Sequence, residues 1–445
     1  MNPATIVLDN GAHSIKASLS SSSDVPAIFP NAIIRSKGDK ATYIGHHAEK
    51  CENYAGLRYR RPFERGMLVD WDAQEAIWHE MYEDSEAIFG VDTRKCALAM
   101  TEPYFNLPNV QSVYDQFVFE EYGFGAYHRC APVAHILRGD LFGNDEPPPE
   151  CAIVVDCGFS YTHVVPLLEG EIMWSAVRRI DIGGKLLTNH LKEQISFRQW
   201  DMLDETCIVE KIKEEACFVS ADFGGDVEMS IRSDNPIALE YVLPDIAARR
   251  PGYVRNKGGN GTGTGQATQT PRAPGEQVLE MDRMRFQVPE VVFTPGYIGL
   301  NQQGLPQTIQ TVINLMPEDL RGLFWANVGL VGGSTGCVGF GGRVYDELRA
   351  LAPPECVVRV YRAENPTTAP FTSLRAFASS PDFSAAMGMG VVTKAEYEEV
   401  GSDGLRGRFR GWDVGLGREE GGGLGWRSVR GSGAEEGDWS MDDSS

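Results

Sequence analysis

The sequence lacks three features that would assign it to whole classes of protein. Its nine cysteines are scattered without any C-x-x-C pair, so neither a disulfide framework nor a zinc site is predicted. No apolar run reaches the roughly 18 residues that a membrane-spanning helix needs. The first residues also lack the charged-then-apolar pattern of a secretion signal. These absences predict an intracellular, soluble chain whose thiols are reduced and which does not contact membranes.

Basic residues are also scarce. The 445 residues include 41 Lys and Arg against 62 Asp and Glu, which gives a formal net charge of −21. A chain this acidic is expected to repel free nucleic acid and anionic membranes. We therefore expect any contact with DNA or nucleosomes to arise only within an assembly that contains a more basic partner.

The most informative pattern present is an internal repeat. The stretch IVLDNGAHSIKASL, residues 6–19, recurs in outline as IVVDCGFSYTHVVPL, residues 153–167. Each copy has an apolar run, an Asp-x-Gly turn and an alternating strand, which is typical of a β-hairpin. Two such hairpins far apart in the chain predict two α/β lobes, each of which contributes one aspartate to a shared cleft.

The hairpin turns have the composition of a phosphate-binding site. Backbone N–H groups of a tight turn can hold a phosphate, with Lys16 as counter-charge. Asp9 and Asp156 could hold the water shell of a divalent cation, although Asp-x-Gly is also the composition of many ordinary turns. A third turn, Gly332-Gly333, comes between a strand pattern and a helix pattern, which favours an anion at the helix N-terminus.

Helical spacing and low-complexity composition mark several other segments. Residues 71–90, 183–195 and 204–220 have the apolar spacing of amphipathic helices, with Asp70 as the expected N-cap of the first. Residues 250–276 have little to bury, and we predict a disordered surface insertion there. The Gly-rich residues 401–445 are predicted to be unfolded, and an incorrect gene-model end remains an alternative.

In their order along the chain, these segments resemble the actin family. DNGAHSIK resembles its first phosphate hairpin, DCGFSYTHVVPLLEG its second, and NVGLVGGSTGCVGFGGRVYDEL its adenosine segment. The resemblance implies an actin-like, two-lobed α/β fold, with duplicated ribonuclease-H-like domains around a nucleotide cleft. Residues 1–150 would form the first lobe, with a small outer subdomain around 31–70, and residues 151–400 the second.

The resemblance also implies a ligand and its contacts. The family's cofactor is ATP or ADP with Mg²⁺, and Lys213 and Glu214 fall where the family contacts the nucleoside. Asp9 and Asp156 are implied as metal ligands. The residues implied to contact the nucleotide are Asp9, Gly11, Lys16, Asp156, Gly158, His163, Gly184, Lys213, Glu214, Gly332 and Gly333.

Three departures from the family's pattern affect the phosphate site. Ala12-His13 replaces a Ser-Gly pair, and Phe159-Ser160 replaces an Asp-Gly pair. Pro132 stands where the family's water-orienting Gln is expected. Hydrolysis depends on a water aligned with the leaving phosphate. We therefore predict no catalytic residues, and either nucleotide binding without efficient hydrolysis or no nucleotide at all.

Other segments resemble a nuclear actin-related subfamily more than actin itself, among them SFRQWDMLDET and FQVPEVVFTPGYIGLNQQGLPQTI. Its members are subunits of a SWR-type ATP-dependent chromatin-remodelling complex, which exchanges a variant histone into nucleosomes. The resemblance implies a non-catalytic architectural subunit, bound to the remodelling ATPase and a zinc-finger subunit. It also implies a nuclear location, with a cytoplasmic pool left open. Residues 241–254 and 286–310 are the expected partner-contacting segments.

Two alternatives stay open from the sequence. An active ATPase or small-molecule kinase of the superfamily would need a general base, for which only His13 and His163 are candidates. A cytoskeletal, filament-forming actin would need a longer loop between PNAIIRSKGDK and TYIG than this chain has. The stretch 370–383 lacks the Trp-x-Gly-Gly core strand of the family, which leaves the local fold of residues 365–385 open.

Overall fold

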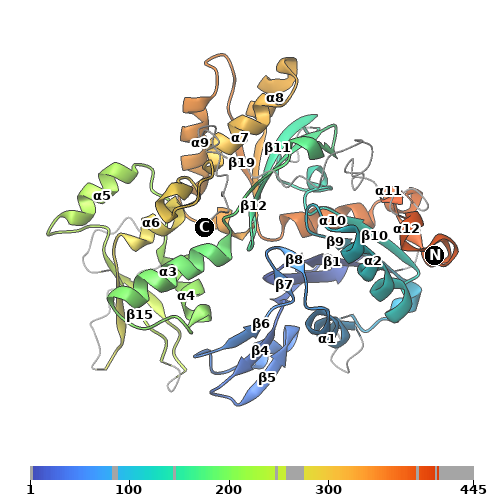
Figure 1. Ribbon diagram of the computed structural model, residues 1–445, viewed down its shortest axis with the longest axis horizontal. Helices are drawn as coiled ribbons and strands as arrows, with labels where there is room; N and C mark the ends of the chain where they lie inside the picture. Colours follow the sequence, from blue (N-terminus) through green and yellow to red (C-terminus); the bar gives the residue numbers. More distant parts are fainter. Residues whose placement is uncertain are drawn as a thin grey trace, which may run out of the picture.

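The computed structural model describes residues 4–82, 89–143, 147–245, 249–256, 275–386, 390–405 and 408–409. Two six-stranded sheets form the centres of two lobes (Figure 1). Among the described residues, no helix combines the length and the apolar character needed to cross a bilayer. The α/β, two-lobed architecture that the hairpin repeat predicts is confirmed.

The sheet of the first lobe has the strand order β20-β10-β9-β1-β2-β3. Strand β1 pairs antiparallel with β2 and parallel with β9, so the first hairpin forms as the sequence predicts. The strands of this sheet are β1 (Ala4–Asn10), β2 (Ser14–Leu19), β3 (Ala27–Pro30), β9 (Cys96–Thr101), β10 (Ala126–Cys130) and β20 (Val392–Thr393).

The sheet of the second lobe repeats this arrangement. Its order is β13-β12-β11-β18-β19, with β14 also paired to β12, and β11 pairs antiparallel with β12 and parallel with β18. The strands are β11 (Cys151–Cys157), β12 (Thr162–Leu168), β13 (Glu171–Ile172), β14 (Arg178–Ile180), β18 (Val328–Val331) and β19 (Val360–Arg362).

Two smaller three-stranded sheets lie at the outer ends of the lobes, whereas a two-stranded ribbon lies beside the first large sheet at the cleft (Figure 1). A three-stranded sheet and a two-stranded ribbon fall within the predicted outer subdomain, and a second three-stranded sheet belongs to the second lobe. Their strands are β4 (Ile33–Ser36), β5 (Ala41–Ile44), β6 (Arg58–Arg60), β7 (Phe63–Glu64), β8 (Met67–Leu68), β15 (Leu239–Val242), β16 (Tyr253–Asn256) and β17 (Val278–Met281).

The predicted amphipathic helices are present as α1, α3 and α4, but α1 ends at Tyr82, short of the predicted residue 90, and residues 83–88 lie outside the described part of the chain. The Asp70 carboxylate caps α1 by accepting the backbone N–H of Ala73 at 3.2 Å. The helices are α1 (Trp71–Tyr82), α2 (Pro108–Gln116), α3 (Gly184–Arg198), α4 (Thr206–Ala216), α5 (Phe223–Ile231), α6 (Met284–Glu290), α7 (Leu305–Asn314), α8 (Arg321–Ala326), α9 (Phe340–Leu351), α10 (Ala369–Ser379), α11 (Pro381–Ala385) and α12 (Lys394–Leu405). Short helical turns are η1 (Gly45–Lys50), η2 (Thr93–Lys95), η3 (Phe117–Glu121), η4 (Ile136–Arg138), η5 (Trp174–Ala176), η6 (Pro295–Ile298), η7 (Glu318–Leu320) and η8 (Gly333–Gly336).

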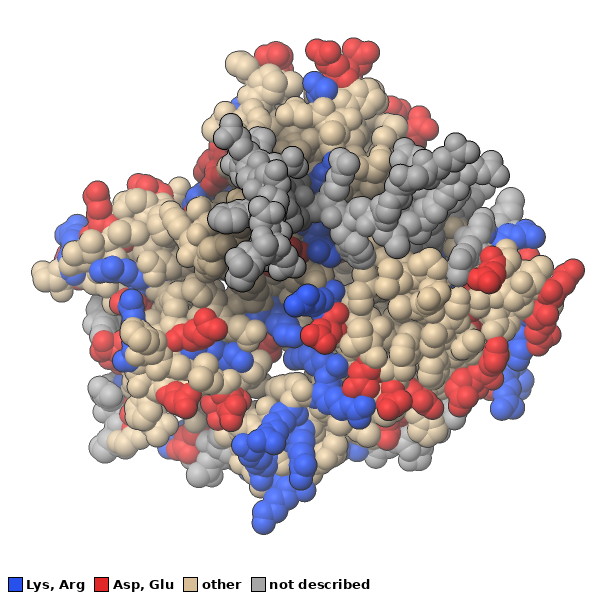
Figure 2. Space-filling model, viewed as in Figure 1, with Lys and Arg blue, Asp and Glu red and all other residues tan. Residues whose placement is uncertain are grey.

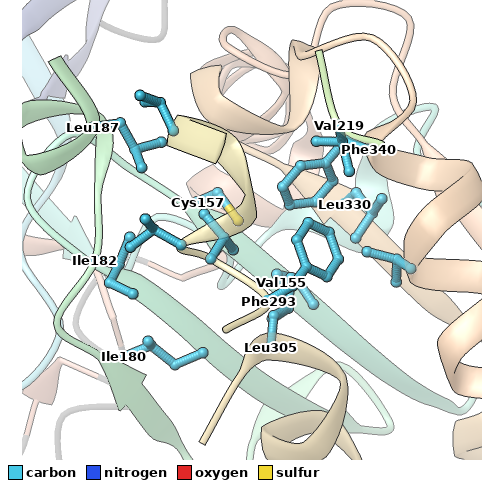
Figure 3. Packing of buried hydrophobic residues seen from close by; sticks show 14 of the residues in the cluster. Val155, Cys157, Ile180, Ile182, Leu187, Val219, Phe293, Leu305, Leu330 and Phe340 are labelled. Atoms are coloured by element: carbon cyan, nitrogen blue, oxygen red, sulfur yellow. The ribbon is translucent and has the colours of Figure 1, made fainter. Parts of the chain in front are cut away.

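The core of the second lobe lies between its sheet and the surrounding helices. Val155 on β11 and Leu330 on β18 pack near Phe293 and Phe340 (Figure 3). The two phenylalanine rings lie 5.5 Å apart between centroids. This core fixes the position of β11 and therefore of the second hairpin turn at its end.

The end of the chain corrects the predicted lobe boundary at residue 400. Helix α10 packs on β1, β9 and η4, and β20 pairs with β10, so the chain after about residue 369 belongs to the first lobe. The physical reason is that β1 is buried on both faces, with Ile6 in one apolar cluster and Val7 in another. Phe371 on α10 belongs to the cluster around Val7. Residues 365–385, whose fold the sequence leaves open, are largely helical here.

Two predictions of disorder need partial correction. Residues 253–256 form β16, and Arg255 is buried in ion pairs with Glu276 at 2.6 Å and Glu240 at 3.9 Å. Residues 401–405 complete α12, and Phe409 is buried beneath the Arg129 guanidinium, 4.0 Å from the ring centroid. Residues 257–274 and 410–445 lie outside the described residues. Composition did not predict the ordered ends of these two segments, because they are anchored by individual contacts: the ion pairs of Arg255 and the packing of Phe409.

Candidate functional site between the two hairpin turns

The two hairpin turns face one cavity of about 130 Å³ between the lobes. Asp9 pairs across the first hairpin with Lys16, and Asp156 across the second with His163. The cavity is lined from both lobes, as the repeat predicts. Its lining includes Asp9, Gly11, Thr101, Tyr104, Pro132, Asp156, Gly158 and His163.

The first carboxylate is fully engaged by neighbouring side chains. Asp9 Oδ2 lies 3.0 Å from the Lys16 ammonium, and Asp9 Oδ1 accepts a hydrogen bond from the Thr101 hydroxyl at 2.6 Å. Gly11 is required in this turn, because a Cβ there would lie 2.7 Å from the Ser14 carbonyl oxygen and 3.5 Å from Lys16 Nζ. The predicted Asp9, Gly11 and Lys16 therefore form one compact unit.

The second carboxylate is held by a residue that the sequence reasoning missed. The Tyr104 hydroxyl donates to Asp156 Oδ2 at 3.0 Å. Burial raises the pKa of Asp156 to about 6; the charge of Asp9 adds to this, whereas the Tyr104 hydrogen bond and Lys16 oppose it. Tyr104 comes shortly after β9, at the same sheet edge as Asp9. That placement next to a parallel strand end is the signal that could have identified it.

His163 is buried against the same tyrosine. The ring centroids of His163 and Tyr104 are 4.4 Å apart. Burial, with a smaller effect of the Arg179 charge, lowers the pKa of His163 to about 3, so the imidazole is neutral near pH 7. A pKa this low makes the neutral ring a weak proton acceptor, and so a poor general base.

A second group of predicted residues meets around the first turn of α3. The Lys213 ammonium donates to the Thr188 hydroxyl at 2.8 Å and to the Gly184 carbonyl at 3.3 Å. A Cβ on Gly184 would lie 3.6 Å from the Ser334 hydroxyl oxygen, so η8 approaches this helix closely. Glu214 is exposed on the neighbouring face of α4.

The turn after β18 requires glycine because it packs closely against the end of β11. Gly332 has a φ of +90°, and a Cβ there would lie 2.4 Å from the Cys157 carbonyl oxygen. Only glycine can adopt this conformation in that space. Gly333 follows as the first residue of η8, so the third predicted turn packs against the end of β11.

An aromatic pair closes the gap between the two hairpin turns. The ring centroids of His13 and Phe159, one from each turn, lie 4.8 Å apart. The Arg61 guanidinium lies 4.9 Å from the Phe159 centroid and donates to the His13 carbonyl at 3.1 Å. Glu210 on α4 lies 3.2 Å from His13 Nε2. We call these four residues the cleft latch, since they join both turns, the outer subdomain and α4.

Comparison of the sequence with known proteins identifies the family to which this chain belongs. The actin family model matches residues 2–410. The chain belongs to the actin family. It is 45% identical over 420 residues to actin-like protein ARP6 of Cryptococcus neoformans, across 92% of this chain and 84% of that protein. It is 36% identical to the Yarrowia lipolytica protein of the same name, across 91% and 97%, and 33% identical to actin-related protein 6 of Drosophila melanogaster, across 92% and 100%.

The actin-family fold ordinarily binds a nucleotide with Mg²⁺, but the residues of this member do not fit a triphosphate between the turns. The rings of His13 and Phe159 lie against each other between the turns, at positions where the family pattern has a glycine and an aspartate. The cavity of about 130 Å³ is smaller than the roughly 300–1,000 Å³ of ordinary ligand pockets. Asp9 and Asp156 are both engaged by side-chain donors. No hydrolytic step follows from this arrangement.

Proposed function

We propose that this actin-family chain is a non-catalytic architectural subunit of a SWR-type chromatin-remodelling complex. In this role it acts in the nucleus, in the exchange of a variant histone into nucleosomes. The observation that carries the non-catalytic part is the contact between His13 and Phe159 across the phosphate gap. The likeness to proteins named actin-related protein 6 supports the subfamily that the sequence segments indicate.

The contacts at the cleft argue against an ATPase or kinase. His13 is engaged through Nε2 with Glu210, and His163 is buried and neutral near pH 7. Pro132, which lacks any side-chain donor, lines the cavity where the family's water-orienting amide is expected. A phosphoryl-transfer enzyme depends on positioned groups at this point, and a proline supplies none. The lowered pKa of His163, about 3, also makes this ring a weak proton acceptor.

The second lobe offers a surface suited to a partner subunit. Phe197, Trp200 and Leu203 are 90%, 43% and 54% exposed, and all three fall in the subfamily-like segment at the end of α3. The Trp200 indole N–H donates to the Val278 carbonyl at 3.2 Å, which holds the ring in place. Clustered, ordered apolar side chains on a surface are typical of protein contacts.

Most of the predicted contact segment 286–310 is buried, as are Tyr241 and Val242, and residues 246–248 lie outside the described part of the chain. We propose that the apolar surface, with the exposed part of 286–310 around Tyr297, meets the remodelling ATPase and the zinc-finger subunit.

Affinity purification from nuclear extract tests the proposal. The tagged wild-type chain is expected to recover a remodelling ATPase and a zinc-finger protein, and the double substitution Phe197→Ser with Trp200→Ser is expected to lose most of both. Val25→Ser, which removes a side chain that is 87% exposed on the first lobe, is the matched control and should recover both. Recovery of the wild-type chain alone would contradict the architectural role. Single-turnover release of phosphate from labelled ATP at the rate of actin would contradict the non-catalytic role.

A further inference from the structure

Three ligand-type side chains meet in the first lobe, away from the cleft. His128 and Cys130 are two residues apart on β10, so they project from the same face of the strand, the face on which α10 packs. His135 lies beyond Pro132, directly before η4. His128 and Cys130 are 6% and 3% exposed. The fold therefore brings an H-x-C-x₄-H pattern together, with the two β10 residues buried and His135 partly exposed.

The spacing of the donor atoms suits a metal ion. One ring nitrogen from each histidine and the Cys130 sulfur all lie within 4.8 Å of one another, and the two Nε2 atoms are 3.0 Å apart. With metal–nitrogen bonds of about 2.0–2.1 Å and a metal–sulfur bond of about 2.3 Å, neighbouring tetrahedral donors lie roughly 3.3–3.6 Å apart. The two nitrogens are already close to that separation, and the Cys130 sulfur, within 4.8 Å of both, must move closer to complete the site.

The histidine rings are held from outside the cluster. His128 Nδ1 lies 2.7 Å from the Gly390 carbonyl oxygen, which can only accept, so Nδ1 carries the proton and the Nε2 lone pair faces the cluster. His135 is stacked on Phe377, with centroids 4.0 Å apart and an interplanar angle of 9°. A backbone carbonyl on the second nitrogen of a ligating histidine is a usual feature of metal sites, because it fixes the tautomer and the ring.

We propose that His128, Cys130 and His135 form a buried binding site for a d¹⁰ cation that prefers nitrogen and sulfur ligands, Zn²⁺ or Cu⁺. On binding, the Cys130 S–H bond breaks, the sulfur binds the metal as a thiolate and the proton leaves to solvent. The hydrogen bond between the two Nε2 atoms is replaced by two metal–nitrogen bonds, and the His135 proton resides on Nδ1.

The charge count distinguishes the two cations. One thiolate and two neutral imidazoles give a neutral site with Cu⁺, which three ligands satisfy. With Zn²⁺ the site has a net charge of +1 and retains a fourth position, which water or another donor must fill. In either case the ion would link β10 to the segment before η4 that holds His135. Gly390 would be tied to the same site through its hydrogen bond with His128.

The test uses the full chain freed of metal by dialysis against a chelator under reducing conditions. Zn²⁺ and Cu⁺ are titrated separately against competing indicators. We expect one ion per chain for at least one of the two, and a Tm that rises with the logarithm of the free metal concentration. Binding of Zn²⁺ or of Cu⁺ identifies the cation, and both results support the site. Less than about 0.1 ion per chain for both metals overturns it.

Substitutions locate the ion. Cys130→Ser and His135→Gln are expected to weaken binding at least 100-fold, and Cys130→Ser should abolish the near-ultraviolet thiolate band of the Co²⁺-loaded chain. Cys96→Ser, a buried thiol on neighbouring β9, and His190→Gln on α3 are the controls that should bind normally. Far-ultraviolet circular dichroism selects the variants that keep the wild-type fold. Unchanged binding in folded Cys130→Ser and His135→Gln, or an equal loss in the controls, overturns the proposal.

Discussion

Single side chains decide what the two hairpin turns can hold. The backbone of each turn is built as a phosphate cradle would be, with Gly11 in one and Gly158 in the other. His13 and Phe159 then fill the space in front of it, and Arg61 and Glu210 hold the histidine in place. We propose that the cleft latch excludes the phosphates from the turns, while the hairpins keep the predicted register.

Opening the latch should restore nucleotide affinity. His13→Gly combined with Phe159→Asp removes both rings and leaves Asp9, Lys16 and Asp156 unchanged. We expect affinity for Mg²⁺-ATP to rise at least about tenfold, which corresponds to about 1.4 kcal/mol, measured by isothermal titration calorimetry. The exposed-site variant Val25→Ser should bind as the wild type does. If the double variant binds no better than the wild type, the rings are not what excludes the phosphates.

The latch also predicts a pH dependence. Burial alone would raise the pKa of Glu210, but the His13 hydrogen bond and the charges of His13, Arg61 and Lys213 outweigh it and lower that pKa below the usual 4.5. The folded chain then binds this proton less readily than the unfolded chain, so the stabilisation is present above pH 4.5 and is lost as the pH falls through the folded pKa.

The substitution Glu210→Gln measures this contribution. We expect it to lower the free energy of unfolding by about 1 kcal/mol at pH 6–7, and by much less near pH 3, in urea titrations followed by circular dichroism. Glu193→Gln, at an exposed position on α3, should have little effect at either pH. A Glu210→Gln effect that stays constant from pH 7 to pH 3 would contradict an ionised Glu210 in the latch.

The residues that the sequence could predict differ from those that it could not. Asp9 and Lys16 were predictable as neighbours because the hairpin pattern fixes their cross-strand register. Arg61 and Glu210 were not, because each reaches the cleft from a separate element and no local pattern records that approach. Tyr104 could have been found from its place just after the parallel strand β9. The meeting of His128 and Cys130 with His135 was not predictable for a related reason. His135 follows a turn, and no C-x-x-C pair marks these residues as metal ligands.

At the scale of whole elements, the first lobe depends on helices from the far end of the chain. The sequence shows the helical and strand patterns themselves, but not which lobe α10 and β20 join. That choice follows from the two apolar faces of β1, one of which stays bare unless α10 covers it. Polar composition likewise concealed β16, whose buried Arg255 is paired with Glu276.

Truncation of a side chain on α10 should be costly. Phe371 is fully buried in the cluster around Val7, and Phe371→Ala is expected to lower the free energy of unfolding by about 3–5 kcal/mol. Phe197→Ala removes an equally large ring that is 90% exposed and should change it by less than about 0.5 kcal/mol. Urea unfolding of both variants measures the two changes in the free energy of unfolding. Changes of similar size would mean that α10 does not cover the first sheet.

At the scale of the whole molecule, charge is unevenly distributed. Although the net charge is −21, Lys and Arg side chains gather over the outer sheet formed by β4, β5 and β6 (Figure 2). Arg35 and Arg58 stand directly opposite each other on β4 and β6, and both are exposed. Like charges in such a pair destabilise a sheet slightly, and a bound polyanion would relieve that repulsion.

This distribution predicts weak and salt-sensitive DNA binding. We expect the isolated chain to give no mobility shift with duplex DNA at physiological salt, because phosphate contacts weaken steeply with ionic strength. Any shift at low salt should disappear in Arg35→Gln with Arg58→Gln, and Arg198→Gln on the second lobe should leave it unchanged. A stable complex of the isolated chain at physiological salt would contradict this assignment.

The return of the chain to the first lobe has a consequence during synthesis on the ribosome. When residues up to about 368 have emerged, every strand of the second lobe is available, yet β1 and β9 still lack the helix that shields one of their faces. The lobe that is translated first is thus the last to be completed. Its nascent form exposes an apolar, aggregation-prone sheet face for most of translation. A premature stop before α10 should therefore yield an aggregating product, not a shorter folded one.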